Sequence, residues 1–295
     1  MECGRGHSIL RVYRAMWRTA DEIRYELDLL SHLERHLPPG VAVSTPIPRR
    51  DGALFRAINA PEGTRHLALF TYAPGAPPAW AGQEQCAAYG GAVGALHNAS
   101  DGFTSAHARL RVDLEYLVEA PLRSLRPRMM HRAADFGYVQ RVAARLQRRI
   151  DELGEDLSWG AGHADLQAKN AHLSRARASR GSRGASQPNG TFTFFDFDCG
   201  GPTWRAFDLS WCRMEAAQAK ERGLWAAFLR GYRERRALTR ADQLAVPWFV
   251  LAIHIWWMGL IADLGPQWGT GWFDTFLTQQ IEALRRWEGT RLTGK

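Results

Sequence analysis

Residues 163–170 read HADLQAKN. Within this run Asp165 and Asn170 stand five positions apart, so that a short loop can turn both side chains toward one point. Downstream, residues 191–198 read TFTFFDFD, in which an apolar, strand-like run ends at a second carboxylate, Asp196. Carboxylate and amide oxygens are the ligands that a hard divalent cation prefers. The two runs therefore predict a loop and a strand end that meet at a cation site.

The order H-x-D-x-x-x-x-N, then a strand ending in Asp, is typical of kinase-type phosphoryl transfer. In that chemistry one Asp accepts the proton of the substrate hydroxyl, while the Asn and the second Asp hold magnesium ions against the polyphosphate. We therefore predict that Asp165 is the catalytic base and that Asn170 and Asp196 bind the metal. A polar loop with scattered carboxylates is the alternative, and the complete set in order favours phosphoryl transfer.

Composition allows a large globular protein. The chain has 295 residues, 45% of them hydrophobic, which suggests one large domain or two lobes with a sizeable core. The net charge of +8 permits a nucleic-acid partner on charge alone, but no nucleic-acid-binding motif accompanies it. The four cysteines (Cys3, Cys86, Cys199 and Cys212) form no C-x-x-C pair, so we expect free thiols in a reducing cytosol and neither a zinc site nor a disulfide.

Residues 244–262 need a separate interpretation. They contain no Asp, Glu, Lys or Arg over nineteen positions, about the length of a membrane span. Pro247 and His254 lie within this run, deep in an otherwise globular sequence, and this favours a buried helix of a catalytic lobe. Residues 1–7 show no targeting signal. We expect a cytoplasmic protein with no membrane partner.

The remaining pattern predicts alternating strands and helices, and then helices alone. Strands are expected at residues 8–13 and 66–72, and a turn at Asp51–Gly52 is expected between the segments around Ile47 and at 54–58. Helices are expected at 19–36, 83–97 and 136–153 and, after Asp208, to the end of the chain. Residues 73–78 break regular structure and are expected to mark a lobe boundary. Residues 174–190, rich in Ser, Gly and Arg, are expected to form a disordered insertion.

Nearly the whole chain resembles the protein-kinase-like small-molecule phosphotransferases, the group of aminoglycoside phosphotransferases, choline kinases and homoserine kinases. The motifs that carry the resemblance are HADLQAKN and, at residues 194–211, FFDFDCGGPTWRAFDLSW. Within the group the sequence looks most like bacterial relatives of stress-response kinase A. The resemblance implies an α+β, bilobal protein-kinase-like fold. Residues 1–73 would form a truncated mixed N-lobe, and residues 74–295 a large, mainly helical C-lobe.

By this resemblance, Asp165 matches the catalytic base, and Asn170 and Asp196 match the metal ligands. Asp198 matches a position that is often acidic in the group, so it is expected to be a further metal ligand or to support one. Asp208 resembles a buried aspartate that braces the catalytic loop. His163 is expected to support the loop through hydrogen bonds, and Lys169 is expected to be an exposed lysine.

The front lobe carries the expected nucleotide-binding residues. Arg11 stands where kinases of this kind have the lysine that binds the phosphates, and a guanidinium can pair with phosphate oxygens in a bidentate manner. Glu26, fifteen positions later on the expected helix, matches the glutamate that orients this cation. Phe70 would lie at the back of the adenine pocket. The Thr71 carbonyl and the Ala73 amide would meet the adenine edge.

One departure concerns the start of the N-lobe. The group usually begins with two strands joined by a turn over the phosphates, whereas only about seven residues precede the Arg11 strand here. The first strand and much of the turn are therefore expected to be missing, with Gly4 and Gly6 as remnants.

The resemblance implies an ATP- and Mg²⁺-dependent transfer of the γ-phosphoryl group to a hydroxyl of a small molecule, with no nucleic-acid partner. Two alternatives remain open. One is a protein Ser/Thr kinase of the stress-response type, although no A-P-E segment is evident. The other is a non-catalytic pseudokinase that acts as a binding protein, which the expected loss of the phosphate turn would favour.

Overall fold

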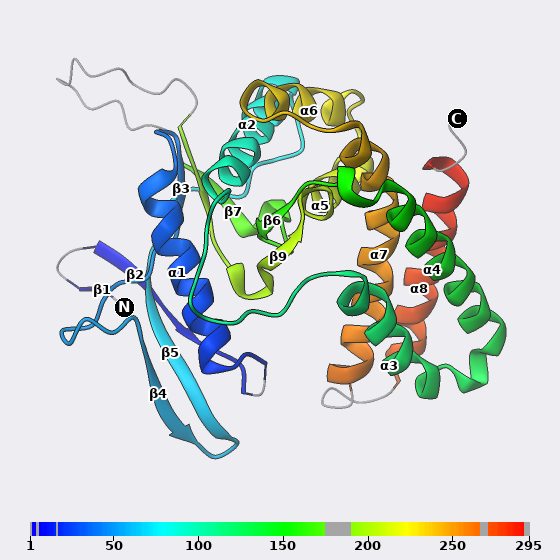
Figure 1. Ribbon diagram of the computed structural model, residues 1–295, viewed down its shortest axis with the longest axis horizontal. Coiled ribbons are helices and arrows are strands. Elements are labelled where there is room, and N and C mark those ends of the chain that lie inside the picture. The colour runs from blue at the N-terminus through cyan, green and yellow to red at the C-terminus, as the bar shows by residue number, and fades with distance from the viewer. Residues whose placement is uncertain (1, 4–5, 16, 175–189, 266–270, 292–295) are drawn as a thin grey trace. The chain divides into compact units, whose positions relative to one another are not determined.

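The computed structural model describes residues 2–3, 6–15, 17–174, 190–265 and 271–291 (Figure 1). Contacts divide the chain into two compact units. The first contains Met1–Leu110, Gly160–Gly201 and Glu215–Ala237, and the second contains Arg111–Trp159, Pro202–Met214 and Leu238–Lys295. This division does not test the lobe boundary expected after residue 73, which stays a prediction. The expected insertion at 174–190 lies almost entirely outside the described residues.

An antiparallel sheet opens the first unit, with its strands in the order β1-β2-β5-β4. These strands are β1 (Glu2–Cys3), β2 (Gly6–Val12), β4 (Phe55–Ala60) and β5 (Gly63–Thr71). The strands predicted at residues 8–13 and 66–72 are thereby confirmed as β2 and β5. The β2–β5 register sets Arg11 opposite Ala68. Arg11 thus lies on a strand of this sheet, as the sequence predicts.

A two-residue strand, β1, precedes β2, and the expected loss of the first strand and much of the phosphate turn stays a prediction. Glu2 pairs with His7 and Cys3 pairs with Gly6, so β1 runs antiparallel to β2. Gly6 has φ 107°, a conformation that glycine adopts without a steric penalty. Gly4, the other expected remnant of the turn, lies outside the described residues.

Helix α1 (Ala20–His36) confirms the helix predicted at residues 19–36. A capping box begins it: Glu22 N–H donates to Thr19 Oγ1 at 3.2 Å, and Thr19 N–H donates to Glu22 Oε2 at 3.0 Å. Its core face buries the periodic residues Ile23, Leu27, Leu30 and Leu33. The same face buries a carboxylate, Glu26, which is only 2% exposed. A carboxylate buried in this way needs partners, so Glu26 is a candidate site residue.

A second sheet in the first unit brings the two predicted site segments together. Its strands are β3 (Val41–Val43), β8 (Thr191–Phe194) and β7 (Ala171–Ser174), with β8 in the centre. Strand β7 starts directly after Asn170, and β8 ends shortly before Asp196. Because β7 and β8 are antiparallel and Ala171 faces Phe194, the start of one strand lies beside the end of the other. A hydrogen bond from Phe195 N–H to the Asn170 carbonyl, 3.0 Å long, continues the ladder toward the site.

The helices of the first unit include α2 (Gln83–Ala99) and α6 (Leu224–Arg235), which pack against each other. Glycines make this close packing possible. An added Cβ at Gly90 would overlap the carbonyl oxygen of Phe228, and one at Gly231 would overlap that of Ala87. The backbones of the two helices therefore touch at these points, where no larger side chain fits.

The second unit is helical, and α7 (Arg240–Leu264) is its central helix, in contact with α3 (Ala120–Arg128), α4 (Ala133–Leu153) and α8 (Phe273–Arg291). Helix α7 contains residues 244–262. By length and composition it could cross a membrane, but 67% of its most apolar window is buried in the structure. That burial is what a core helix of a globular unit shows, as the sequence predicts.

The other elements are short or shared by the two units. They are α5 (Arg205–Gln218), β6 (Trp159–Gly162), β9 (Gly201–Trp204), a π-helical turn (Glu115–Glu119) and 3₁₀ turns at Met130–Arg132, Gly154–Asp156, Ala168–Asn170 and Phe197–Cys199.

The α2–α6 contact yields a prediction with a neighbouring control. We expect Gly90→Ala to lower the free energy of unfolding by about 1–3 kcal/mol, the usual penalty for overpacking, because the new methyl group meets the backbone of α6. In Gly91→Ala the methyl group would lie 3.5 Å from the Gly231 carbonyl, an ordinary contact. This second variant should be neutral or more stable by about 0.5–1 kcal/mol, because alanine favours helix. Urea unfolding measures both, and equal stability of the two variants would contradict the packing described.

Candidate active site

The segment 163–170 forms a strained loop around Asp165. Ala164 has φ 60°, and among the described non-glycine residues only Ala164 and Asp196 have positive φ. Such conformations cost about 1–3 kcal/mol and tend to occur at functional sites. His163 holds the loop: its Nδ1 accepts the Asp165 N–H at 3.4 Å, and its Nε2 lies 2.9 Å from the Phe195 carbonyl. His163 thus ties the loop to the end of β8, in agreement with the supporting role predicted for it.

Asp165 lies half-buried in this loop and accepts hydrogen bonds from two side-chain amides. Asn170 Nδ2 donates to its carboxylate at 2.8 Å, and Gln167 Nε2 also donates to it. Burial raises the pKa of Asp165 above its ordinary value, while the bonds from Gln167 and Asn170 act in the opposite direction. A carboxylate with a raised pKa is a better proton acceptor than an ordinary aspartate. Asp165 and Asn170, five positions apart, are therefore in direct contact.

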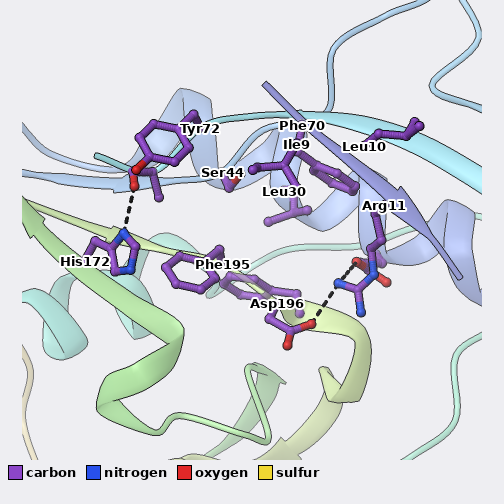
Figure 2. A pocket seen from close by; sticks show the side chains of 13 residues that line it. Ile9, Leu10, Arg11, Leu30, Ser44, Phe70, Tyr72, His172, Phe195 and Asp196 are labelled. Carbon is purple, nitrogen blue, oxygen red and sulfur yellow. Dashed lines mark hydrogen bonds and ion pairs between the residues drawn. The ribbon is translucent and has the colours of Figure 1, made fainter. Parts of the chain in front are cut away.

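Arg11 lies between the two acidic side chains that follow β8. Its guanidinium is 2.8 Å from an Asp196 carboxylate oxygen and 2.7 Å from an Asp198 carboxylate oxygen (Figure 2 shows the Asp196 contact). Glu26, the expected partner, is farther away, at 3.9 Å. Burial would lower the pKa of Arg11, but the charges of Asp198, Glu26 and Asp196 outweigh burial and raise it. The structure thus brings three carboxylates together around the Arg11 guanidinium.

Glu26 is the most buried member of this group. Tyr13 donates its hydroxyl to Glu26 Oε1 at 3.1 Å, while Glu26 Oε2 has no hydrogen-bond partner among the described residues. Burial raises the pKa of Glu26, and the charge of Arg11 opposes that shift. Burial and the neighbouring Glu26 charge also raise the pKa of Tyr13. Tyr13 was not anticipated from the sequence. It follows directly after β2 and stands two positions after Arg11, a spacing that places two side chains on the same face of an extended chain.

Next to this cluster is a cavity of about 440 Å³, within the range of small-molecule sites (Figure 2). Its walls combine apolar side chains with Arg11, Glu26 and Asp196, so that an apolar part adjoins a charged end. Phe70 and Ala73 line it, as the predicted adenine pocket requires. A purine with its phosphates matches this division into an apolar and a charged part.

The expected adenine edge at residues 71–73 is held by side chains that the sequence did not indicate. His172 Nδ1 lies 2.7 Å from the Ala73 carbonyl, and the His172 ring packs edge-on against Phe195 (Figure 2). The Thr71 carbonyl, expected to meet adenine, already accepts the Ser44 hydroxyl. A carbonyl oxygen has two lone pairs, so one acceptor position of Thr71 remains. The only sequence signal for His172 is its position two residues after Asn170.

Two further predictions concern Lys169 and Asp208. Lys169 is exposed, as expected. Asp208 is fully buried on α5, and its bracing role stays a prediction. An unexpected carboxylate, Glu215, accepts Ala168 N–H at 3.0 Å and Trp80 Nε1–H at 2.9 Å, and burial raises its pKa. Glu215 thus supports the turn between Asp165 and Asn170.

The described residues contain no cluster of three His, Cys, Asp or Glu side chains that could hold a metal alone. The residues that converge are nevertheless suited to a divalent cation. Asp196 and Asp198 already share one cation, the Arg11 guanidinium. Because the Asn170 amide nitrogen is bonded to Asp165, its amide oxygen is the atom left for a metal. Two carboxylates and one amide oxygen fit magnesium if nucleotide phosphates supply further ligands.

Comparison with known proteins agrees with this fold. Residues 2–244 match the model of the phosphotransferase enzyme family. An uncharacterized protein of Deinococcus radiodurans is 42% identical over 279 residues, covering 92% of this chain and 75% of that protein. The match spans 65–75% of the length of this protein and of two other curated relatives.

Solved structures place the fold in the protein-kinase-like class. A microcompartment-associated aminopropanol kinase is 25% identical with a TM-score of 0.73, and the match covers 96% of this chain and 86% of that one. The amicoumacin kinase hAmiN, solved with AMP-PNP, Ca²⁺ and Ami, is 20% identical with a TM-score of 0.68 over 96% and 82% of the two chains. The α+β, protein-kinase-like fold predicted from the sequence is confirmed. The chain belongs to the phosphotransferase enzyme family.

The position of Arg11 yields a prediction. In Arg11→Met the carboxylates of Asp196 and Asp198 lose their shared cation and repel each other. Each ion pair contributes about 0–1 kcal/mol to stability. In the absence of metal, the variant should therefore unfold at a slightly lower temperature than the parent. Millimolar Mg²⁺ should raise the unfolding temperature of the variant more than that of the parent, because no guanidinium competes for the carboxylates. Differential scanning calorimetry measures both, with the exposed Arg56→Met as control. Equal Mg²⁺ effects in variant and parent would show that Arg11 and the metal do not share these ligands.

Proposed function

We propose that this protein transfers the γ-phosphoryl group of ATP to a hydroxyl group of a small molecule. The observation that carries the proposal is the juxtaposition of Asp165 with Asn170, and of Asp196 and Asp198 with Arg11, beside an apolar cavity. The family match and the kinase neighbours support it. A cytoplasmic protein without nucleic-acid or membrane partners remains our expectation.

In this proposal the nucleotide occupies the cavity. The purine lies against Phe70, Tyr72 and Phe195, with its edge at Thr71 and Ala73. Arg11 turns from the carboxylates to the phosphates, and Glu26 keeps it oriented. Asn170, Asp196 and Asp198 would hold magnesium, which when bound neutralises the charge of the polyphosphate. The amicoumacin kinase complex, which contains AMP-PNP and Ca²⁺, supports nucleotide and divalent-metal use in this fold.

Asp165 then acts on the acceptor. As the acceptor oxygen forms its bond to the γ-phosphorus, the bond from that phosphorus to the β–γ bridging oxygen breaks and ADP leaves with the electron pair. The hydroxyl proton passes to the Asp165 carboxylate. Gln167 and Asn170 orient the carboxylate, so the step depends on positioning more than on covalent chemistry.

The kinase neighbours suggest which class of acceptor to test first. The neighbour at 25% identity is an aminopropanol kinase, which favours a small amino alcohol as the first acceptor to test. A coupled assay of ADP release with amino alcohols, sugars and a generic protein substrate would identify the acceptor. ADP release stimulated only by the protein substrate would replace our proposal by the Ser/Thr kinase alternative. The complete set of Asp165, Asn170 and Asp196 disfavours the pseudokinase alternative.

The role of Asp165 is tested by Asp165→Asn. The amide has almost the same shape but cannot accept the hydroxyl proton, so kcat should fall about a hundredfold or more, the usual range for a general base. The affinity for AMP-PNP should stay near that of the parent, because Asp165 does not line the cavity. Asp151→Asn, the same exchange at an exposed position, is the control. Undiminished phosphotransfer by folded Asp165→Asn would remove Asp165 from the mechanism.

A further inference from the structure

A buried arginine outside the motifs connects the metal loop with helix α1. Arg109 is 9% exposed. The hydrogen bonds of its guanidinium go to backbone carbonyl oxygens and not to carboxylates. Its Nε donates to Gly200 at 2.6 Å, and one terminal nitrogen donates to Asp198 at 2.5 Å and to Phe197 at 3.3 Å. The other terminal nitrogen donates to the Glu22 carbonyl at 2.8 Å. One guanidinium thus joins two segments that are far apart in the sequence.

The segment that carries Arg109 is itself fastened to α1. Ser105 Oγ donates to Asp28 at 2.6 Å, and Ala108 N–H donates to Asp21 at 2.6 Å. His107 Nδ1 lies 2.8 Å from the other Asp21 oxygen. In Figure 1 this connection, which follows α2, passes beside α1. Residues 105–109 therefore form a strap along α1 with the guanidinium of Arg109 at its end.

Two glycines, Gly200 and Gly201, allow close backbone contacts of the segment that Arg109 binds. A Cβ at Gly201 would lie 2.7 Å from the Leu110 carbonyl and 3.1 Å from Arg109 Cγ. A Cβ at Gly200 would lie 2.8 Å from the Gly162 carbonyl. Gly201 therefore lets the segment 197–201 approach the strap closely enough for Arg109 to bond three carbonyls of that segment. Gly200 lets the same segment approach the Gly162 carbonyl.

Arg18 binds the same loop from a different direction. Its Nε donates to the Asp198 carbonyl at 2.8 Å, and its guanidinium lies 3.5 Å from Glu22. The Asp198 carbonyl thus accepts from two arginines. A loop held in this way can keep Asp196 in its left-handed conformation, φ 67°, which an isolated loop would leave.

We propose that Arg109 is a positioning residue that fastens residues 197–200 to helix α1 and so holds Asp196 and Asp198 in front of Arg11 and Glu26 before nucleotide and metal bind. This inference rests on the proposed function, in which these carboxylates bind the metal. Its physical basis is the fork of the guanidinium, whose donors point in fixed directions to both segments. A lysine keeps the charge but cannot bond all four carbonyls.

The test compares Arg109→Lys with the parent and with Arg56→Met, an exposed arginine of the same unit. Hydrogen exchange should become faster in residues 196–201, including the Gly200 amide that donates to Phe197, while α2 and α6 remain protected. The Mg²⁺ concentration needed for half-maximal AMP-PNP binding should rise about tenfold or more, as is usual when a group supporting metal ligands is lost. Arg18→Lys, which also changes a donor to Asp198, should show the same pattern more weakly.

The outcomes are distinguishable. Unchanged exchange in residues 196–201 of Arg109→Lys would overturn the inference, and so would an equal increase throughout the first unit, which would make Arg109 a general stabilising residue. An unchanged Mg²⁺ requirement would also overturn it. If the parent itself bound no AMP-PNP, the proposed function would fail, while hydrogen exchange would still decide whether Arg109 fastens the loop.

Discussion

Three carboxylates, those of Glu26, Asp196 and Asp198, converge on a single guanidinium, and much of the first unit serves to make this possible. Glu26 is buried on α1, and both aspartates follow β8. Without a cation between them their mutual repulsion would oppose folding, because charges at about 4 Å interact by about 1–4 kcal/mol at the dielectric constants of water and protein surfaces. Arg11 supplies that cation from β2. The same carboxylates are what a divalent cation would require in the proposed complex, and the Arg11 guanidinium is then available to the polyphosphate.

The geometry of the site follows from a short antiparallel ladder. Strand β7 begins after Asn170 and β8 ends before Asp196, so pairing of the two strands brings a loop and a strand end together. Two residues with positive φ, Ala164 and Asp196, lie on either side of this junction. Hydrogen bonds from His163 to Phe195, and from Arg109 to the carbonyls beyond Asp196, hold these unfavourable conformations.

The part of the site that could be predicted is the part encoded locally. Asp165 and Asn170 are signalled by their spacing in one loop, and Asp196 by the apolar run before it. Helix α1 and strands β2 and β5 follow from their periodicity and turn residues. In contrast, Arg109, Glu215 and His172 act through contacts across many positions of the sequence, and nothing in their own neighbourhood distinguishes them from ordinary polar residues. The expected Arg11–Glu26 pair shows the same limit: the order of strand and helix indicates proximity, but the nearer partners of Arg11 come from the distant segment after β8.

The account depends most on Arg11 leaving Asp196 and Asp198 when a magnesium nucleotide arrives. A crystal structure of the protein with AMP-PNP and Mn²⁺, located by its anomalous scattering, tests this directly. The account predicts a metal bound by Asp196 with Asp198 or Asn170 as a further ligand, and the Arg11 guanidinium turned to the phosphates. Nucleotide bound in the cavity, with Arg11 still paired to both carboxylates and no metal between them and the phosphates, would contradict it.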